Sequence, residues 1–423
     1  MSKGFLEERS LPIEFSEPLS VFAQLRMTSI LNAAGPATRL GGIPLDRRVL
    51  EAMTEASMSC VRMEELQQLA GEVMASWTGT EAALITCGAG AALALAVAAC
   101  LTRYDVGASN SLPIVRSGRD EVVMLRAQRY PYDHLVELTG ARIIEVGYAE
   151  STHLYEVAEA LSPSVAAFLF YPSQPSDAPA LAEIVEVCHS RDVPVIVDAA
   201  LEDTPPVLDH RWVGAGADLV LFSGGKSIGG PQASGVLCGK RLLVDAASLQ
   251  SLDMDVRPQT WIRRDLLNDH VVAGPPHHGL GRAMKVGKEE IAGLLEAGRL
   301  FAARDHASYT GALADRMTSL FDRVGQHPGV RTDVVTTGYA PRGRLHVDAG
   351  EARFSVWALL EALQDGTPHL HLNESAAWSG TALIDLRGID PRDDVSVADL
   401  IGTTLDRLAS AEPLPAPVNA RTR

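Results

Sequence analysis

The chain has 423 residues, of which 46% are hydrophobic and 21% charged, the composition of a globular protein with ample core. Its formal net charge of −16 argues against a broad surface for nucleic acid or anionic membrane, because phosphate binding draws on clustered Lys and Arg. The five cysteines are scattered and show no metal-ligand spacing, which predicts buried thiols and no metal site. We recognise no signal peptide and no apolar run long enough to span a bilayer, so we expect a cytoplasmic protein.

Short apolar runs alternate with helical patterns along the chain. The runs predict strands at residues 82–87, 121–125, 141–146, 166–171, 193–200, 218–223 and 234–239. The small-residue stretch after the first run predicts a buried helix, and residues 178–192 predict an amphipathic one. Strands that alternate with helices imply crossover connections. We therefore expect an α/β domain with a mainly parallel seven-stranded sheet that is covered on both faces.

The pattern changes near Val286, where a long helical segment is followed by irregular short strands. We predict an N-terminal segment at 1–45, a large domain at 46–285 and a smaller α+β domain at 286–412. The last residues, 413–423, are rich in proline and polar residues and predict a disordered tail.

The stretch "LVLFSGGKSIGGPQASG" at residues 219–235 carries a lysine that two chemistries could use. Gly225, Lys226 and Ser227 are similar to the end of a P-loop, but that motif needs a glycine at the position of Val220. A helix should also follow, whereas glycines and a proline occupy residues 229–231. The P-loop interpretation therefore fails, and Lys226 is either a solvated loop charge or a lysine held close to a bulky group.

Other polar or small residues also follow predicted strands, at the edge of the sheet where ligands bind in such folds. Gly88, Ala89 and Gly90 open a helix, so they form either an anion site or only a tight turn. Asp198 ends a very apolar run and either caps a turn or pairs with a buried cation. Gln174 lies in a segment that by itself predicts only a turn.

Pyridoxal 5'-phosphate (PLP) accounts for these features together. This cofactor needs an anion cradle for its phosphate, a carboxylate beside its ring nitrogen and a lysine for its aldehyde. The order of phosphate loop, Asp198 and Lys226 along the chain is the order found in fold-type I PLP enzymes.

Four segments resemble the selenocysteine-synthase-like family of these enzymes, in its D-glucosaminate-6-phosphate ammonia-lyase-like branch. The segments are "LNAAGPATRLGG", "TGTEAALITCGAGAALALAVAACLT", "FSGGKSIGGPQASGVLCGK" and "GLGRAMKVGKEEIAGLL". The resemblance spans about residues 28–300, and the segments around Lys226 and Arg282 are the most specific. It implies the fold-type I PLP-dependent transferase fold and at least a homodimer.

The resemblance also implies roles for individual residues. Lys226 would be the Schiff-base lysine and the base at the substrate Cα, and Asp198 would hold the proton on the ring nitrogen. The other implied cofactor-binding residues are Gly88, Ala89 and Gly90 at the phosphate, Ser223 as a hydroxyl donor, Gln174 near the phenolic oxygen, and His134 stacked on the ring. Tyr130 and Tyr132, in the same segment as His134, are alternatives for the stacking role.

Substrate recognition is less constrained. Arg39, Arg282 and Lys285 are candidate partners for a substrate carboxylate or phosphate. Only about thirty residues precede Asn32, and Gly225 stands where the tRNA-dependent transferases generally have an acidic residue. We therefore expect a small amino acid as substrate rather than tRNA.

Three functions remain open at this point. We expect an ammonia-lyase type α,β-elimination through a Cα carbanion. The same site could instead support a racemase, an aldolase or a β-replacement enzyme. The third possibility, a protein that keeps the fold only to bind RNA or a partner, is disfavoured because the Asp198 and Lys226 pair is complete. A tRNA-dependent selenium transferase is disfavoured as well, as argued above.

Overall fold

The computed structural model describes residues 21–172, 177–201, 204–205, 207–251, 256–336 and 338–410. Within them the chain forms two compact units. The larger unit contains residues 36–309 with 338–340, and the smaller unit contains the other described residues. The sequence-based domain boundaries differ from these limits and stay predictions, and the predicted tail lies outside the described residues.

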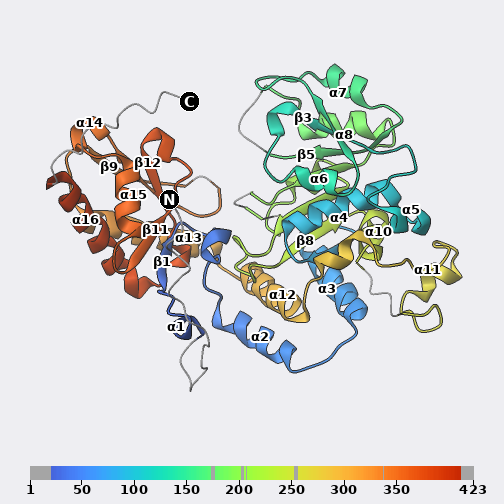
Figure 1. Cartoon of the computed structure of the whole chain (residues 1–423), viewed down its shortest axis with the longest axis horizontal. Helices are drawn as coiled ribbons and strands as arrows, with labels where there is room; N and C mark the ends of the chain where they lie inside the picture. The colour runs from blue at the N-terminus through green and yellow to red at the C-terminus, as the bar shows by residue number, and fades with distance from the viewer. Residues whose placement is uncertain are drawn as a thin grey trace, which may run out of the picture. The chain divides into compact units, whose positions relative to one another are not determined.

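A seven-stranded sheet forms the centre of the larger unit (Figure 1). Its strands lie in the order β2-β8-β7-β6-β5-β3-β4. β8 is antiparallel to both of its neighbours, and the remaining pairs are parallel. The predicted mainly parallel seven-stranded sheet is therefore confirmed. The strands are β2 (Ala82–Thr86), β3 (Glu121–Leu125), β4 (Arg142–Val146), β5 (Val165–Phe170), β6 (Val195–Asp198), β7 (Leu219–Ser223) and β8 (Gly235–Gly239).

Helices cover both faces of this sheet. Those of the larger unit are α2 (Arg47–Ser57), α3 (Met63–Thr78), α4 (Ala89–Thr102), α5 (Val106–Ser111), α6 (His134–Leu138), α7 (Leu154–Ala160), α8 (Leu181–His189), α9 (Arg211–Gly214), α10 (Arg241–Leu249), α11 (Arg264–Asn268) and α12 (Lys288–Ala302). Short 3₁₀ helices are η1 (Thr38–Leu40), η2 (Arg126–Gln128) and η3 (Leu280–Met284). α4 is apolar on all sides and its residues from Ala92 onward are buried, as the small-residue pattern predicts.

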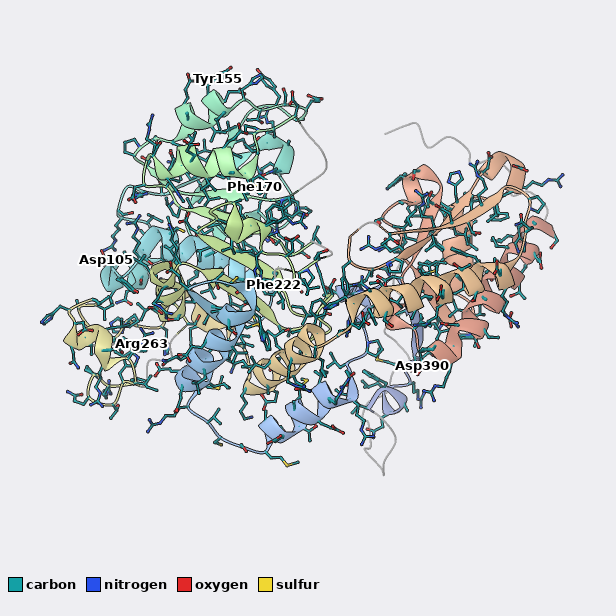
Figure 2. The ribbon with its side chains drawn as sticks, turned by 180° about the vertical axis from the view of Figure 1, so that it is seen from behind. Asp105, Tyr155, Phe170, Phe222, Arg263 and Asp390 are labelled. Carbon is teal, nitrogen blue, oxygen red and sulfur yellow. The ribbon has the colours of Figure 1, made fainter. Side chains whose placement is uncertain are left out.

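The strands divide their side chains between two cores because successive residues point to opposite faces. Val197, Val220 and Phe222 pack in the core under α3, α8 and α12. Ile196 and Leu221 pack in the core under α4 and α10. Figure 2 labels Phe222 near the end of β7, where it is 2% exposed. Continuous apolar runs are thus needed here, and they are what the sequence shows.

The smaller unit is an α+β structure, as predicted. It contains α1 (Val21–Gln24), β1 (Ile30–Ala33), most of α13 (His306–Val324), β9 (Val330–Val335), β10 (Arg342–Val347), α14 (Ala349–Ala352), α15 (Val356–Gln364), β11 (His369–Leu372), η4 (Ala377–Ser379), β12 (Thr381–Ile384), η5 (Leu386–Gly388), η6 (Pro391–Asp393) and α16 (Asp394–Ser410). β9, β10 and β12 form an antiparallel sheet, and β1 pairs in parallel with β11. The N-terminal segment is thus joined to the C-terminal part of the chain.

Two further sequence expectations concern thiols and membranes. Cys100, Cys188 and Cys238 are buried, and burial raises the pKa of each to about 12. Cys60 is exposed and Cys87 half-buried, so the expectation of burial is wrong for Cys60. Among the described residues no helix is both long and apolar enough to cross a bilayer.

Candidate active site

The parallel strands end at one edge of the sheet. We call it the carboxyl edge, and it consists of the last residues of β3, β5, β6 and β7 and the residues that follow them. Because neighbouring parallel strands run in the same direction, their terminal residues meet there. Asp198 is the last residue of β6, and it is paired in register with Leu221 of β7. The loop that contains Lys226 begins directly after Ser223, the last residue of β7. The edge therefore brings together residues that lie far apart in sequence.

Asp198 is a buried carboxylate, 4% exposed, with both oxygens bonded. Oδ1 accepts a hydrogen bond from the Ala200 backbone N–H at 2.9 Å. Oδ2 accepts one from the Tyr130 hydroxyl at 2.5 Å. Burial raises the pKa of Asp198, and the bonds from Tyr130 and Ala200 and the charge of Lys226 oppose that rise.

Lys226 lies at the same place on the carboxyl edge. Its Nζ donates a hydrogen bond to the Ala200 carbonyl oxygen at 2.6 Å. Asp198 accepts from the N–H of that same residue. The Lys226 ammonium and the Asp198 carboxylate are therefore bonded to the carbonyl oxygen and the N–H of one residue, Ala200. The positive charge of Lys226 also favours the ionised form of the buried carboxylate.

The glycines before Lys226 allow its loop to pack against the chain that leads into β8. A Cβ at Gly224 would lie 2.3 Å from Ser234 Oγ, and one at Gly225 would lie 2.9 Å from the Gln232 Cα. The bulky neighbour that these glycines predict therefore includes the protein's own backbone. This packing fixes the path of the chain on which Lys226 is carried.

The predicted phosphate cradle is the N-terminus of α4. Gly88 is its N-cap residue, and no side chain caps the first turn. The backbone N–H groups at this end have no partner within the helix, and the helix dipole favours an anion there. A Cβ built on Gly88 would meet nothing within 4 Å, so there is open space beside the cradle.

The other predicted cofactor residues lie in different surroundings, and their roles stay predictions. Ser223 is half-buried at the end of β7 and pairs in register with Gly235. Gln174 lies outside the described residues. His134 is exposed, and its Nδ1 lies 2.7 Å from the Pro131 carbonyl oxygen. The structure brings Tyr130, and not His134, into contact with Asp198. The stacking role of His134 stays a prediction.

The candidate substrate residues lie on two segments. Arg39 is exposed on η1, and the side chain of the neighbouring Thr38 is hydrogen-bonded to Gln232 at 3.0 Å, just after the Lys226 loop. Arg282 is half-buried on η3, which contacts α4, and Lys285 follows η3 and is exposed. Their roles in substrate binding stay predictions. In the described residues no group of three or more His, Cys, Asp or Glu side chains could hold a metal ion.

Comparison with known proteins relates this architecture to one group of enzymes. The family model for L-seryl-tRNA selenium transferase matches residues 49–259. A 5'-C-glycyluridine monooxygenase-decarboxylase from Streptomyces sp is 32% identical over 89% of this chain and 90% of that protein. The chain belongs to the selenocysteine-synthase-like family. A D-glucosaminate-6-phosphate ammonia lyase from Salmonella typhimurium is 28% identical over 88% of this chain and 94% of that protein.

Solved structures give the same fold for this member of the family. The structure of a D-glucosaminate-6-phosphate ammonia-lyase covers 93% of this chain with a TM-score of 0.77 and 24% identity. A ureidoglycine-glyoxylate aminotransferase from Bacillus subtilis covers 94% with a TM-score of 0.55 and 14% identity. The predicted family, fold-type I architecture and membership of a PLP-dependent class of enzymes are confirmed.

The sequence did not indicate which aromatic side chain of residues 130–134 would turn inward. Tyr130, Tyr132 and His134 occur at alternate positions, and the turn that carries the two tyrosines leads directly into α6, which His134 begins. Tyr130 is distinguished by its bond to Asp198 and by its packing on Tyr171, with ring centroids 3.9 Å apart. That contact joins residues after β3 with residues after β5, so a local pattern could not show it.

Proposed function

We propose that this protein is a PLP-dependent lyase that removes ammonia from a small amino acid by α,β-elimination through a Cα carbanion. The observation that carries the proposal is the convergence of Asp198 and Lys226 on the two polar atoms of Ala200. The similarity to an ammonia lyase over 88% of the chain supports the choice of reaction.

The residues at the carboxyl edge have the chemistry that PLP requires. The uncapped N-terminus of α4 beside open space suits its phosphate. The buried Asp198 suits its protonated ring nitrogen, because a buried carboxylate needs a positively charged partner. Lys226 carries the amine that its aldehyde needs.

Each side chain then has a defined task. PLP, when bound, supplies an electron sink for the pair of electrons left at the substrate Cα. Lys226 Nζ would hold the cofactor and then accept the proton from Cα. Asp198 would keep a proton at the ring nitrogen by its negative charge, and the N–H groups at the start of α4 would hold the phosphate. Loss of a β-hydroxyl from the substrate and hydrolysis of the product would give a keto acid and ammonia.

The first experiment tests the cofactor. Borohydride treatment of the holoenzyme should fix the pyridoxyl group covalently to Lys226, and peptide mapping should find it there. Lys226→Ala should remove the label, whereas Lys240→Ala, at the other end of β8, should retain it. A label on Lys285 or Lys288, or none, would contradict the assignment.

The second experiment tests the reaction. The holoenzyme is incubated with D- and L-amino acids that carry a β-hydroxyl or another leaving group, and products are followed. Keto acid with ammonia is the expected result. An enantiomer, an aldehyde or a substituted amino acid would instead identify a racemase, an aldolase or a β-replacement enzyme.

A second candidate is an oxygen-dependent decarboxylation. It is favoured by the 32% identity to the 5'-C-glycyluridine monooxygenase-decarboxylase, over nearly the whole of both chains. Incubation with an amino acid attached to a nucleoside distinguishes the two functions. Oxygen uptake with release of carbon dioxide would select this candidate, and ammonia without oxygen uptake would select the lyase.

We also propose that no tRNA takes part. A selenium transferase from Clostridium perfringens is similar over only 54% of this chain, and the net charge is −16. Seryl-tRNA should therefore fail to bind even at low salt, where phosphate contacts are strongest. Tight binding of seryl-tRNA, with free amino acids unreactive, would select the selenium transferase instead.

The remaining proposals concern assembly and location. Apolar side chains of α2, α3 and the segment between them are exposed, including Met58 at 80% and Leu69 at 55%, which supports a homodimer. Light scattering should give twice the chain mass, and Met58→Glu with Leu69→Glu should shift it toward the monomer. The described cysteines are free, which supports the cytoplasm as the location.

A further inference from the structure

Tyr130 has a direct bond to the buried carboxylate of the site. Its hydroxyl donates to Asp198 Oδ2 at 2.5 Å. The phenol ring lies flat on Tyr171, with centroids 3.9 Å apart and 4° between the planes. Tyr171 is itself 8% exposed, and its backbone N–H donates to Gln128 Oε1 at 3.1 Å. The hydroxyl is therefore aimed by a ring that has little freedom to turn.

A second set of contacts fixes the backbone of Tyr130. The Asp133 carboxylate, on a residue that is 6% exposed, accepts from the Tyr130 backbone N–H at 3.2 Å and from Arg129 Nε. Arg129 also binds Glu145 at the end of β4, and Glu145 accepts from Arg126 Nε at 2.8 Å. The turn that carries Tyr130 is thus tied to the neighbouring strand by ion pairs.

We propose that Tyr130 is a positioning residue that orients the Asp198 carboxylate and keeps it ionised. The inference rests on the proposed function, because it concerns the site where the ring nitrogen would bind. With Oδ1 bonded to Ala200 and Oδ2 to Tyr130, the carboxylate cannot rotate without losing a hydrogen bond. Each oxygen retains lone pairs that can accept a further donor.

The charge balance around Asp198 gives the hydroxyl its importance. The positive charge of Lys226 lowers the pKa of the Asp198 carboxylate, while Asp133 and Tyr171 raise the pKa of the Tyr130 hydroxyl. Burial and the nearby Asp198 raise the pKa of Tyr130, so the phenol stays a donor. A donor stabilises the charged form of a buried carboxylate over its neutral form.

The consequence for catalysis is the location of one proton. Without the Tyr130 hydroxyl, Asp198 is a stronger base, and the proton shared with the ring nitrogen moves from nitrogen to the carboxylate oxygen. No electrons are gained or lost in this transfer. A ring nitrogen without its proton withdraws electrons less strongly, so removal of the Cα proton by Lys226 becomes slower.

Tyr130→Phe isolates this effect, because it keeps the ring stacked on Tyr171 and removes only the hydroxyl. Tyr148→Phe is the matched control, since Tyr148 is 67% exposed. Both holoenzymes are prepared with ¹⁵N-labelled PLP, and ring-nitrogen protonation is followed against pH by NMR. For Tyr130→Phe we expect loss of that proton at lower pH and a kcat about 10- to 100-fold lower, with KM little changed. Tyr148→Phe should match the wild type.

A fluorotyrosine at position 130 provides a test of opposite sign, because a more acidic phenol is a stronger donor and should hold the ring proton to higher pH. Wild-type ring protonation in Tyr130→Phe overturns the positioning role, even if thermal stability falls. Tighter PLP binding by Tyr130→Phe also overturns it, since the hydroxyl would then compete with the ring nitrogen. If borohydride does not label Lys226 in the wild type, the proposed function fails and this inference with it.

Discussion

Gly235 connects the phosphate cradle to the central sheet and provides the sharpest test of the site. It begins β8 and pairs with Thr86 on one side and Ser223 on the other. A Cβ at this position would lie 2.5 Å from the Gly88 carbonyl carbon and 2.7 Å from the Ala89 backbone nitrogen. Gly235→Ala therefore pushes directly on the backbone that would hold the phosphate.

The size of the effect follows from these distances. Ordinary contacts of a Cβ lie at 3.4–4 Å, so the cradle and β8 must separate by about 1 Å. Both are backbone within a buried core, and overpacking of this kind costs about 1–3 kcal/mol, which lowers Tm by about 2–10 °C. Displaced N–H donors lose charge-assisted hydrogen bonds to phosphate, so the Kd for PLP should rise about 10- to 100-fold.

Spectroscopic titration with PLP and with unphosphorylated pyridoxal measures the effect. Gly235→Ala should lose affinity for PLP and retain its affinity for pyridoxal, because only the phosphate uses the cradle. Gly214→Ala is the control, since a Cβ there meets nothing within 4 Å. If a folded Gly235→Ala protein keeps the wild-type preference for the phosphorylated form, α4 is not the phosphate site.

Three further predictions concern stability. Burial raises the pKa of Asp198 above its ordinary 3.8, so the protonated side chain contributes fully to folding stability below pH 3.8, and this contribution is lost as pH rises through the pKa of the folded state. The apo Asp198→Asn variant should therefore melt at a higher temperature than the wild type at pH 7, and the difference should vanish near pH 4. Asp218→Ala removes the ion pair with Lys240 and leaves the buried Val195 N–H without its acceptor, so chemical denaturation should show a loss of about 1–3 kcal/mol. Arg387→Met strands a carboxylate on Asp385, which is 4% exposed, so denaturation should show a loss of about 3–5 kcal/mol that Asp385→Leu partly restores; a smaller loss in the single variant would mean that water reaches the pair.

The sequence by itself was sufficient for the central sheet, and it pointed to Asp198, Lys226 and Gly88 as candidates for the site. A strand buried on both faces must be apolar throughout, so the runs that end at Asp198 and Ser223 were visible without tertiary information. Asp198 stood out because a charged residue at the end of such a run needs a partner. Lys226 stood out because the glycines on both sides of it imply a bulky neighbour. Gly88 was visible because a strand and a helix meet there.

Tertiary structure alone decided which side chains surround those residues. Tyr130 reaches Asp198 because the turn after β3 packs against Tyr171 after β5, and the chain order of these strands does not reveal which loops touch. Gly225 tolerates no side chain because Gln232 folds back on it, which the sequence could show only as a glycine-rich stretch. Residues 30–33 pair with β11, near the other end of the chain, and no local pattern in the sequence shows this pairing either. Apolar periodicity reports the burial of one segment, whereas a contact between distant segments depends on how both are packed.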